Sequence, residues 1–146
     1  MKINEAGLNL IKEFEGLELT AYLCPALKLT VGYGHLVHPK DNIALGEKIP
    51  LELAELFLKE DIVFAEAAVN SLVKVPLSEN QFSALVSFVY NLGRTAFANS
   101  TLLKLLNLEN YDLASDQFLR WVIANGKVLD GLKRRRAAER KLYLTT

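Results

Sequence analysis

Three side chains near the N-terminus have types and spacing that could support acid–base chemistry. Glu15 is followed nine residues later by Cys24, the only cysteine of the chain, and Thr30 follows six residues after that. A carboxylic acid can give a proton to a leaving oxygen, a thiol can orient water or act as a nucleophile, and a hydroxyl can hold water. Taken singly, each also has an ordinary interpretation as a solvated glutamate, a buried thiol or a strand residue.

The position of Glu15 favours its protonated form. The residue follows Phe14 at the expected C-terminal end of a helix and precedes Gly16. The negative end of the helix dipole and desolvation by apolar neighbours both oppose ionisation of a carboxyl group there. We therefore expect Glu15 to be able to act as a general acid.

Hydrophobic periodicity predicts the elements that must position these residues. A short helix is expected over about residues 4–14, and short strands with turns are expected from about 23 to 49. Apolar residues three or four apart then predict a long helix over about residues 51–73. Because the expected strands precede this helix, the helix should connect an N-terminal β lobe to the C-terminal part of the chain.

The second half of the chain is predicted to be helical. Ser78 and Gln81 form a capping-box pattern ahead of a nearly continuous apolar helix that ends at Gly93. Three further helices are expected, over about residues 100–107, 112–124 and 131–143. The predicted fold class is therefore α+β. We expect a single domain (1–146) with a small N-terminal β-containing lobe (about 15–50), a connecting helix (about 51–73) and a helical C-terminal lobe (about 74–146).

Composition predicts a soluble globular domain. The 146 residues are 51% hydrophobic and 23% charged, which is ordinary for such domains. A single cysteine permits no intramolecular disulfide, and with only two histidines it argues against a metal site, so we expect neither a metal nor a cofactor. The N-terminal apolar residues are interrupted by polar ones, which predicts neither a signal peptide nor a membrane anchor.

The charges cancel overall, but the C-terminus is basic. Seventeen basic residues balance seventeen acidic ones, and residues 133–146 contain six of the basic residues against Glu139 alone. Such a run could bind nucleic acid or an acidic polymer, although it is more commonly the solvated face of a terminal helix. The balanced total and the absence of interleaved aromatic residues argue against a nucleic-acid partner.

The spacing of residues 15–35 resembles that of the phage-type lysozymes, the muramidase endolysins of glycoside hydrolase family 24. The family pattern is matched by Glu15-Gly16, Tyr22, Cys24, Thr30 and Gly32-Tyr33-Gly34-His35. Four later segments match in the family's order: NQFSALVSFVYNLG (80–93), AFANSTLLKLLN (96–107), FLRW (118–121) and GLKRRRAAER (131–140). The resemblance thus covers essentially the whole chain and implies a lysozyme-like fold.

This resemblance implies hydrolysis of the β-1,4 bond between N-acetylmuramic acid and N-acetylglucosamine in peptidoglycan. By analogy, Glu15 is the general acid, Cys24 stands where many members have Asp, and Thr30 helps to hold the attacking water. A water between two catalytic groups is the arrangement of an inverting glycosidase. The Cys24 thiol could orient that water, accept a hydrogen bond as thiolate or attack the anomeric carbon itself; water positioning with inversion is our hypothesis.

The resemblance also implies saccharide contacts at Leu36, Tyr90 and Ser100, in a cleft expected between the lobes. An aromatic residue such as Tyr90 on an apolar helix could equally belong to the core, and His35 is expected to be structural. The sequence departs from close relatives after Pro25, where ALKL replaces a glycine-containing turn.

The expected partners follow from the same resemblance. They are the peptidoglycan substrate and a holin, a pore through which a monomeric enzyme would pass from the host cytoplasm to the periplasm or cell wall. The alternative function is that of a non-catalytic peptidoglycan-binding protein with a lysozyme fold, because fold alone does not establish activity.

Overall fold

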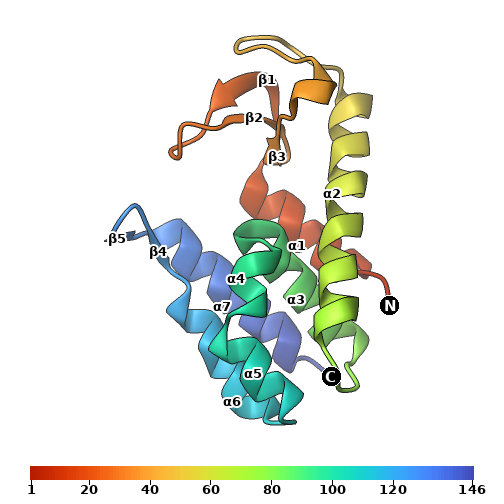
Figure 1. The fold of residues 1–146 in the computed structure, drawn as a ribbon, viewed down its shortest axis with the longest axis vertical. Helices are drawn as coiled ribbons and strands as arrows, with labels where there is room; N and C mark the ends of the chain where they lie inside the picture. Colours follow the sequence, from red (N-terminus) through yellow and green to blue (C-terminus); the bar gives the residue numbers. More distant parts are fainter. The chain divides into compact units, whose positions relative to one another are not determined.

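A computed structural model describes residues 1–146 (Figure 1) and divides the chain into two compact units. Unit 1 comprises residues 1–14 and 64–146, and unit 2 comprises residues 15–63. Helices α1 (Glu5–Glu15) and α2 (Leu51–Leu72) each contribute residues to both units. Their bounds lie within one residue of those predicted from periodicity, and the combination of helices with a small sheet confirms the α+β class.

Unit 2 contains a three-stranded antiparallel sheet. Its strands are β1 (Glu18–Leu23), β2 (Leu29–Gly32) and β3 (His35–Leu36), in that order, followed by the short 3-10 helix η1 (Pro39–Asp41). Strand β1 begins earlier than the stretch in which we predicted strands. Because Ala21 is its only fully buried residue, β1 lacks the regular alternation that marks a half-buried strand.

The register of this sheet separates its two faces. Thr30 pairs with Tyr22 on β1 and with Leu36 on β3, so these three side chains form one row on the same face. Val31 pairs with His35, and both are buried on the opposite face. That second face covers a hydrophobic core made by Ala21, Val31, Ile49, Ala54 and Phe57.

Unit 1 is built around helix α3 (Glu79–Leu92). The predicted capping box is confirmed, because Ser78 Oγ accepts a hydrogen bond from the Gln81 backbone N–H at 3.0 Å and Gln81 Oε1 accepts one from the Ser78 N–H at 2.8 Å. Every residue from 82 to 89 is buried. A helix buried on all sides is the centre of its unit, as its apolar sequence predicted.

The remaining elements of unit 1 follow α3 in sequence. They are α4 (Arg94–Ala98), α5 (Thr101–Asn107), α6 (Tyr111–Gln117), η2 (Phe118–Arg120), β4 (Ile123–Ala124), β5 (Lys127–Val128) and α7 (Asp130–Leu144). The prediction of one helix over 112–124 is wrong beyond Gln117, because the chain continues as the 3-10 helix η2 and enters the β4–β5 hairpin at Ile123. The Asn125-Gly126 pair turns this hairpin with φ values of 52° and 75°, a conformation that Asn-Gly favours.

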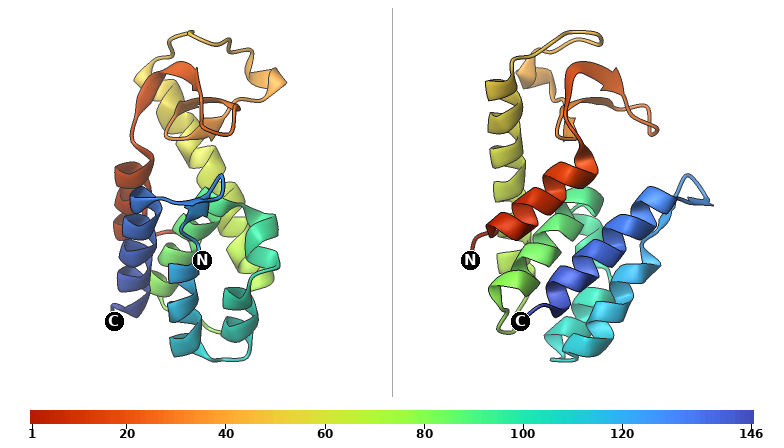
Figure 2. Two further views of the ribbon diagram at one scale, coloured as in Figure 1. Left: turned by 90° about the vertical axis from the view of Figure 1, so that its left-hand side faces the viewer. Right: turned by 180° about the vertical axis from the view of Figure 1, so that it is seen from behind.

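Helix α7 lies along α3 (Figure 2) and carries charge into the core of unit 1. Arg136 and Glu139 are fully buried and Arg135 is 3% exposed, so the expectation of a solvated basic face is wrong for these residues. The two arginines pair with Glu139 at 3.2 and 2.7 Å, and Ser87 of α3 donates a hydrogen bond to the same carboxylate at 2.6 Å. The buried guanidinium groups are therefore held inside the protein and do not face a polyanion.

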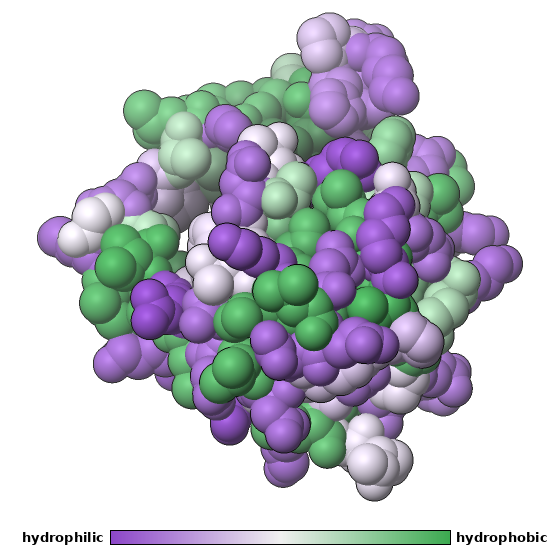
Figure 3. All heavy atoms as spheres, turned by 60° about the horizontal axis from the view of Figure 1, so that its bottom comes forward, coloured by the Kyte–Doolittle hydropathy of each residue, from purple (hydrophilic) through white to green (hydrophobic).

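The surface carries scattered apolar residues. On the face drawn in Figure 3, hydrophobic groups are separated by hydrophilic side chains, as is usual for a folded protein in water. No helix combines the length and the apolar character needed to cross a membrane.

Candidate active site

The carboxyl group of Glu15 lies against Gly34. Glu15 is the last residue of α1, and Gly16 ends the helix with a φ of 70°. A methyl group on Gly34 would overlap Glu15 Oε1 and would lie 3.1 Å from Glu15 Cδ. Gly34 also has a φ of 74°, which side chains rarely adopt. Gly34, the second glycine of the Gly-Tyr-Gly-His motif, therefore leaves the space that the side chain of the predicted acid occupies.

Replacing Gly34 by alanine is expected to displace Glu15 and to lower the rate of wall lysis about 100-fold, because misplacing a catalytic group by about 1 Å can cost that much. Turbidity of a cell-wall suspension measures the rate. Gly46→Ala is the matched control: it lies in the same unit with a φ of 83°, but nothing lies within 4 Å of its added methyl group. Equal activity in the two variants would show that Gly34 has no role in placing the acid.

Cys24 stands at the end of β1, where a tight turn leads to β2. The Cys24 N–H donates to Lys28 O at 2.9 Å, and the Leu27 N–H donates to Cys24 O at 2.8 Å. Leu27 closes this turn with a φ of 61°, the conformation for which a glycine is usual. The ALKL segment thus forms a closed hairpin turn with Leu27 in the left-handed conformation.

The same turn favours the thiolate form of Cys24. Its pKa lies below the ordinary value, chiefly because the backbone N–H of Lys28 hydrogen-bonds the sulfur. Burial opposes this shift, while the Ala26 N–H and the Thr30 side chain add to it. Thr30 is 3% exposed, and its hydroxyl also donates to Lys28 O at 2.9 Å. The Thr30 side chain therefore lies near enough to the Cys24 sulfur to affect its ionisation, and the role that the two residues share remains a prediction.

Two exposed residues flank Thr30 on the sheet. Leu36, a predicted saccharide contact, is 45% exposed, and Tyr22 is 38% exposed on the other side of Thr30. The pKa of Tyr22 is raised by burial and then by the charges of Cys24, Glu15 and Glu18. Its phenol thus lies within electrostatic reach of the acid and the thiol, although we assigned this residue of the family motif no role in the site. Its place in the motif, two residues before Cys24, is the signal that could have found it.

The other two predicted saccharide contacts belong to unit 1. Tyr90 lies on α3 directly after the fully buried stretch and is half-buried, so part of its side chain is accessible to solvent. Ser100 is 6% exposed and caps α5: its hydroxyl accepts from the Leu103 N–H at 3.1 Å and donates to Phe97 O at 2.7 Å. The side chain of Ser100 therefore has a structural task, and its contact with substrate remains a prediction.

His35 is held by two carboxylates and an aromatic ring, all within unit 2. Its Nδ1 lies 2.7 Å from Asp61 Oδ2, its Nε2 lies 3.0 Å from Asp41 Oδ2, and its ring stacks on Phe57 with centroids 3.9 Å apart. A neutral imidazole has only one N–H, so donation to both carboxylates requires the imidazolium form. Burial opposes that charge, but the hydrogen bonds and charges of Asp61 and Asp41 outweigh it and raise the pKa of His35.

This arrangement predicts a pH-dependent stability. The contribution of His35 is complete below about pH 6.5, the ordinary value for histidine, and decreases as the pH rises through its higher folded-state pKa. Burial raises the pKa of Asp41, but the His38 N–H and the His35 side chain outweigh burial and lower it. The contribution of Asp41 is therefore complete above about pH 3.9 and is lost at lower pH.

Thermal unfolding measured from about pH 5 to about pH 9 should show a fall in Tm at the alkaline end that Asp61→Asn reduces. His38→Asn is the control for the other histidine, an exposed residue that touches the His35 ring only edge-on, with centroids 5.8 Å apart, and it should preserve the fall. A wild-type Tm that does not change over this range would contradict the assignment of an ion-paired His35.

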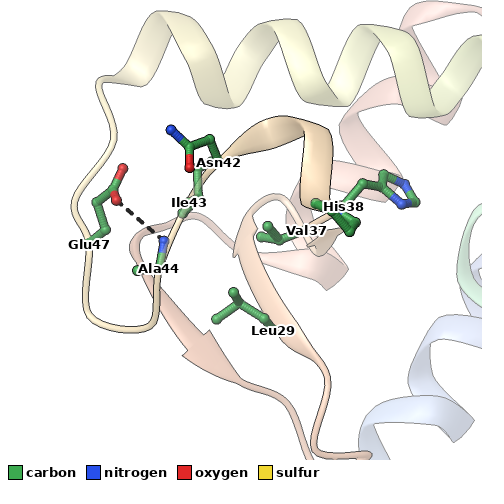
Figure 4. Close-up of a pocket in the computed structure, with 8 residues that line it drawn as sticks. Leu29, Val37, His38, Asn42, Ile43, Ala44 and Glu47 are labelled. Carbon is green, nitrogen blue, oxygen red and sulfur yellow. Dashed lines mark hydrogen bonds between the residues drawn. The ribbon is translucent and has the colours of Figure 1, made fainter.

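A separate pocket of unit 2 lies between β2 and the segment that follows β3 (Figure 4). It has a volume of about 480 Å³ and is lined by Leu29, Val37, His38, Pro39, Asn42, Ile43, Ala44 and Glu47. Two of these residues are hydrogen-bonded to each other: the Glu47 carboxylate accepts from the Ala44 N–H at 3.3 Å. None of the six predicted site residues lines this pocket. The structure contains no group of three or more His, Cys, Asp or Glu side chains suited to a metal ion.

Comparison with known proteins gives one consistent result. Residues 12–139 match the family described as phage lysozyme. The chain is 49% identical over 147 residues to an endolysin of Acyrthosiphon pisum secondary endosymbiont phage 1, with 98% of each sequence covered, and 44% identical to the endolysin of Salmonella phage P22, with 99% of each covered. It matches the solved muramidase domain of SpmX from Asticaccaulis excentricus with a TM-score of 0.88, at 40% identity and 99% coverage of both chains.

The fold and these relatives define a lysozyme, a glycoside hydrolase of the muramidase class. The chain belongs to the phage lysozyme family, as its sequence motifs predicted. It is accordingly an enzyme of the endolysin type.

Proposed function

We propose that this chain hydrolyses the β-1,4 bond between N-acetylmuramic acid and N-acetylglucosamine in bacterial peptidoglycan, with inversion at the anomeric carbon. Glu15 is the general acid that protonates the leaving oxygen. Cys24 and Thr30 position the water that attacks from the opposite face of the sugar. Leu36, Tyr90 and Ser100 contact the saccharide.

The observation that carries this proposal is the pairing of Cys24 with Thr30. A thiol that ionises more readily than usual can accept a hydrogen bond from a water, as the aspartate common in the family does, while Thr30 supplies a hydroxyl beside it. Direct attack by the Cys24 sulfur would instead form a covalent glycosyl–enzyme intermediate and lead to retention. Water positioning is preferred because Thr30 has a role in it.

NMR of the first-formed product tests the mechanism. Digestion of purified glycan strands should release a reducing end in the α configuration, because inversion of a β-linked sugar gives the α anomer before mutarotation. Cys24→Asp is the matched control and should give the same anomer, since a carboxylate can hold the water as well. A β product from the wild type would show retention and would exclude the water-attack mechanism.

We also infer that the protein acts as a monomer, accumulates in the host cytoplasm and reaches the wall through a holin. The inference is supported by the similarity to phage endolysins over nearly the whole chain. Expression in a bacterial host should clear the culture only when a membrane pore is co-expressed; clearing without the pore would contradict the need for a holin.

A further inference from the structure

The row Tyr22–Thr30–Leu36 defines one face of the sheet of unit 2, with a buried residue between two exposed ones. Directly opposed residues of antiparallel strands point to the same side, so Tyr22 and Leu36 stand on either side of Thr30. Cys24 follows directly after β1, two residues beyond Tyr22, and its N–H donates to Lys28 O, so the pairing of the two strands continues to Cys24. The neighbouring residues of each strand, Ala21 and Val31, point to the core instead. Thr30 therefore lies buried in the middle of the row, and the exposed side chains of Tyr22 and Leu36 form a wall on each side of it.

Tyr22 is the larger of these two walls. An aromatic ring that remains 38% exposed beside a buried threonine leaves apolar surface for a ligand to cover. A pyranose ring has a face of C–H groups whose burial on such a surface is favourable. The phenol also lies within electrostatic reach of both Glu15 and Cys24. In the proposed mechanism these two groups act on opposite faces of the sugar.

The hydroxyl of Tyr22 stays neutral in this setting. Burial and the charges of Cys24, Glu15 and Glu18 raise its pKa, so the phenol adds no negative charge beside the acid and the thiol. A neutral aromatic ring can therefore contact a sugar there without disturbing the ionisation of the two catalytic groups.

From this geometry we propose that Tyr22 is a further substrate-contacting residue, whose ring forms one wall, opposite Leu36, for the sugar bound between Glu15 and Cys24. The inference rests on the proposed function, since it assumes that a saccharide occupies this face. It assigns the contribution of Tyr22 to its ring rather than to its hydroxyl.

Binding measured in an inactive background tests the inference separately from catalysis. In Glu15→Gln, isothermal titration calorimetry with a purified N-acetylglucosamine–N-acetylmuramic acid tetrasaccharide gives the reference Kd. Adding Tyr22→Ala should weaken binding about 30-fold, the size expected for truncating a large aromatic contact. Adding Tyr22→Phe keeps the ring and should change the Kd less than about threefold. The same ranking should appear in KM when Glu15 is intact.

Leu23→Ala is the matched control, because Leu23 is the next residue of β1, is 49% exposed and points to the opposite face. It should leave the Kd unchanged. Unaltered binding by Tyr22→Ala, or equal losses in Tyr22→Phe and Tyr22→Ala, would overturn the ring-wall assignment. Tyr22→Leu provides a second truncation should the alanine variant unfold at a lower temperature. If the wild type fails to hydrolyse the wall although the tetrasaccharide binds through Tyr22, the proposed function fails and this inference stands.

Discussion

Glu15→Gln should lower the rate of wall lysis about 1,000-fold, the size of effect expected for removing a general acid. The glutamine side chain has nearly the same shape, so it can occupy the space beside Gly34, but its amide cannot give a proton to the leaving oxygen. The loss should therefore appear in kcat, with little change in KM. Rates from cell-wall turbidity, at enzyme concentrations high enough to detect the residual activity, measure the effect.

Glu13→Gln is the matched control for this prediction. Glu13 lies on the same helix two residues earlier and is exposed, so the same chemical change occurs away from the site. It should keep wild-type activity, and both variants should keep the wild-type Tm. Lysis that Glu15→Gln leaves unchanged would remove the acid from the mechanism, whatever the other residues do.

Helices with strong local signals were predictable from the sequence. The bounds of α2 follow from its apolar residues three or four apart, and α3 begins at the Ser78–Gln81 capping box and ends before Gly93. In each case the information lies within the element itself. The prediction therefore needed no knowledge of what the helix packs against.

Elements determined by distant contacts were not predictable in the same way. The sequence of α7 indicates a basic, solvated helix, yet Glu139 bonds Ser87, which is 52 residues away. Helix α4 has only five residues, too short for a periodic pattern to appear. For the β4–β5 hairpin, however, the Asn-Gly signal was present in the sequence and was outweighed by a helical interpretation of the residues before it.

The candidate site shows the same division. The spacing of Glu15, Cys24 and Thr30 identified residues that unit 2 contains together, because they lie close in sequence on one helix end and one hairpin. Gly34 and Tyr22 belong to the same motif, but their roles beside these residues were missed. The contact between Gly34 and Glu15 depends on how the chain folds back, and the row through Tyr22 depends on strand register, which sequence alone does not specify.

Glu139→Gln should destabilise the protein by about 3–5 kcal/mol, the cost expected when one partner of a buried ion pair is removed. The carboxylate is fully buried, its Oε1 lies 2.7 Å from Arg136 Nε, and its Oε2 accepts hydrogen bonds from Arg135 Nε at 3.2 Å and Ser87 Oγ at 2.6 Å. A neutral amide leaves two buried guanidinium groups without their counter-charge and turns N–H donors toward one of them. Urea unfolding measures the lost free energy.

Asp116→Asn is the control that separates burial from ion pairing. Asp116 of α6 pairs at 2.9 Å with Arg140, which lies on α7 next to Glu139. The Asp116 and Arg140 side chains are 60% and 35% exposed, respectively. Water screens such a pair, so the loss should stay below about 1 kcal/mol. Similar losses in the two variants would mean that the Glu139 network is worth no more than a surface pair. A loss confined to Glu139→Gln would instead assign part of the packing of α7 on α3 to this buried network, because Glu139 accepts a hydrogen bond from Ser87 of α3 and its partner Arg136 donates one to Asn91 of α3.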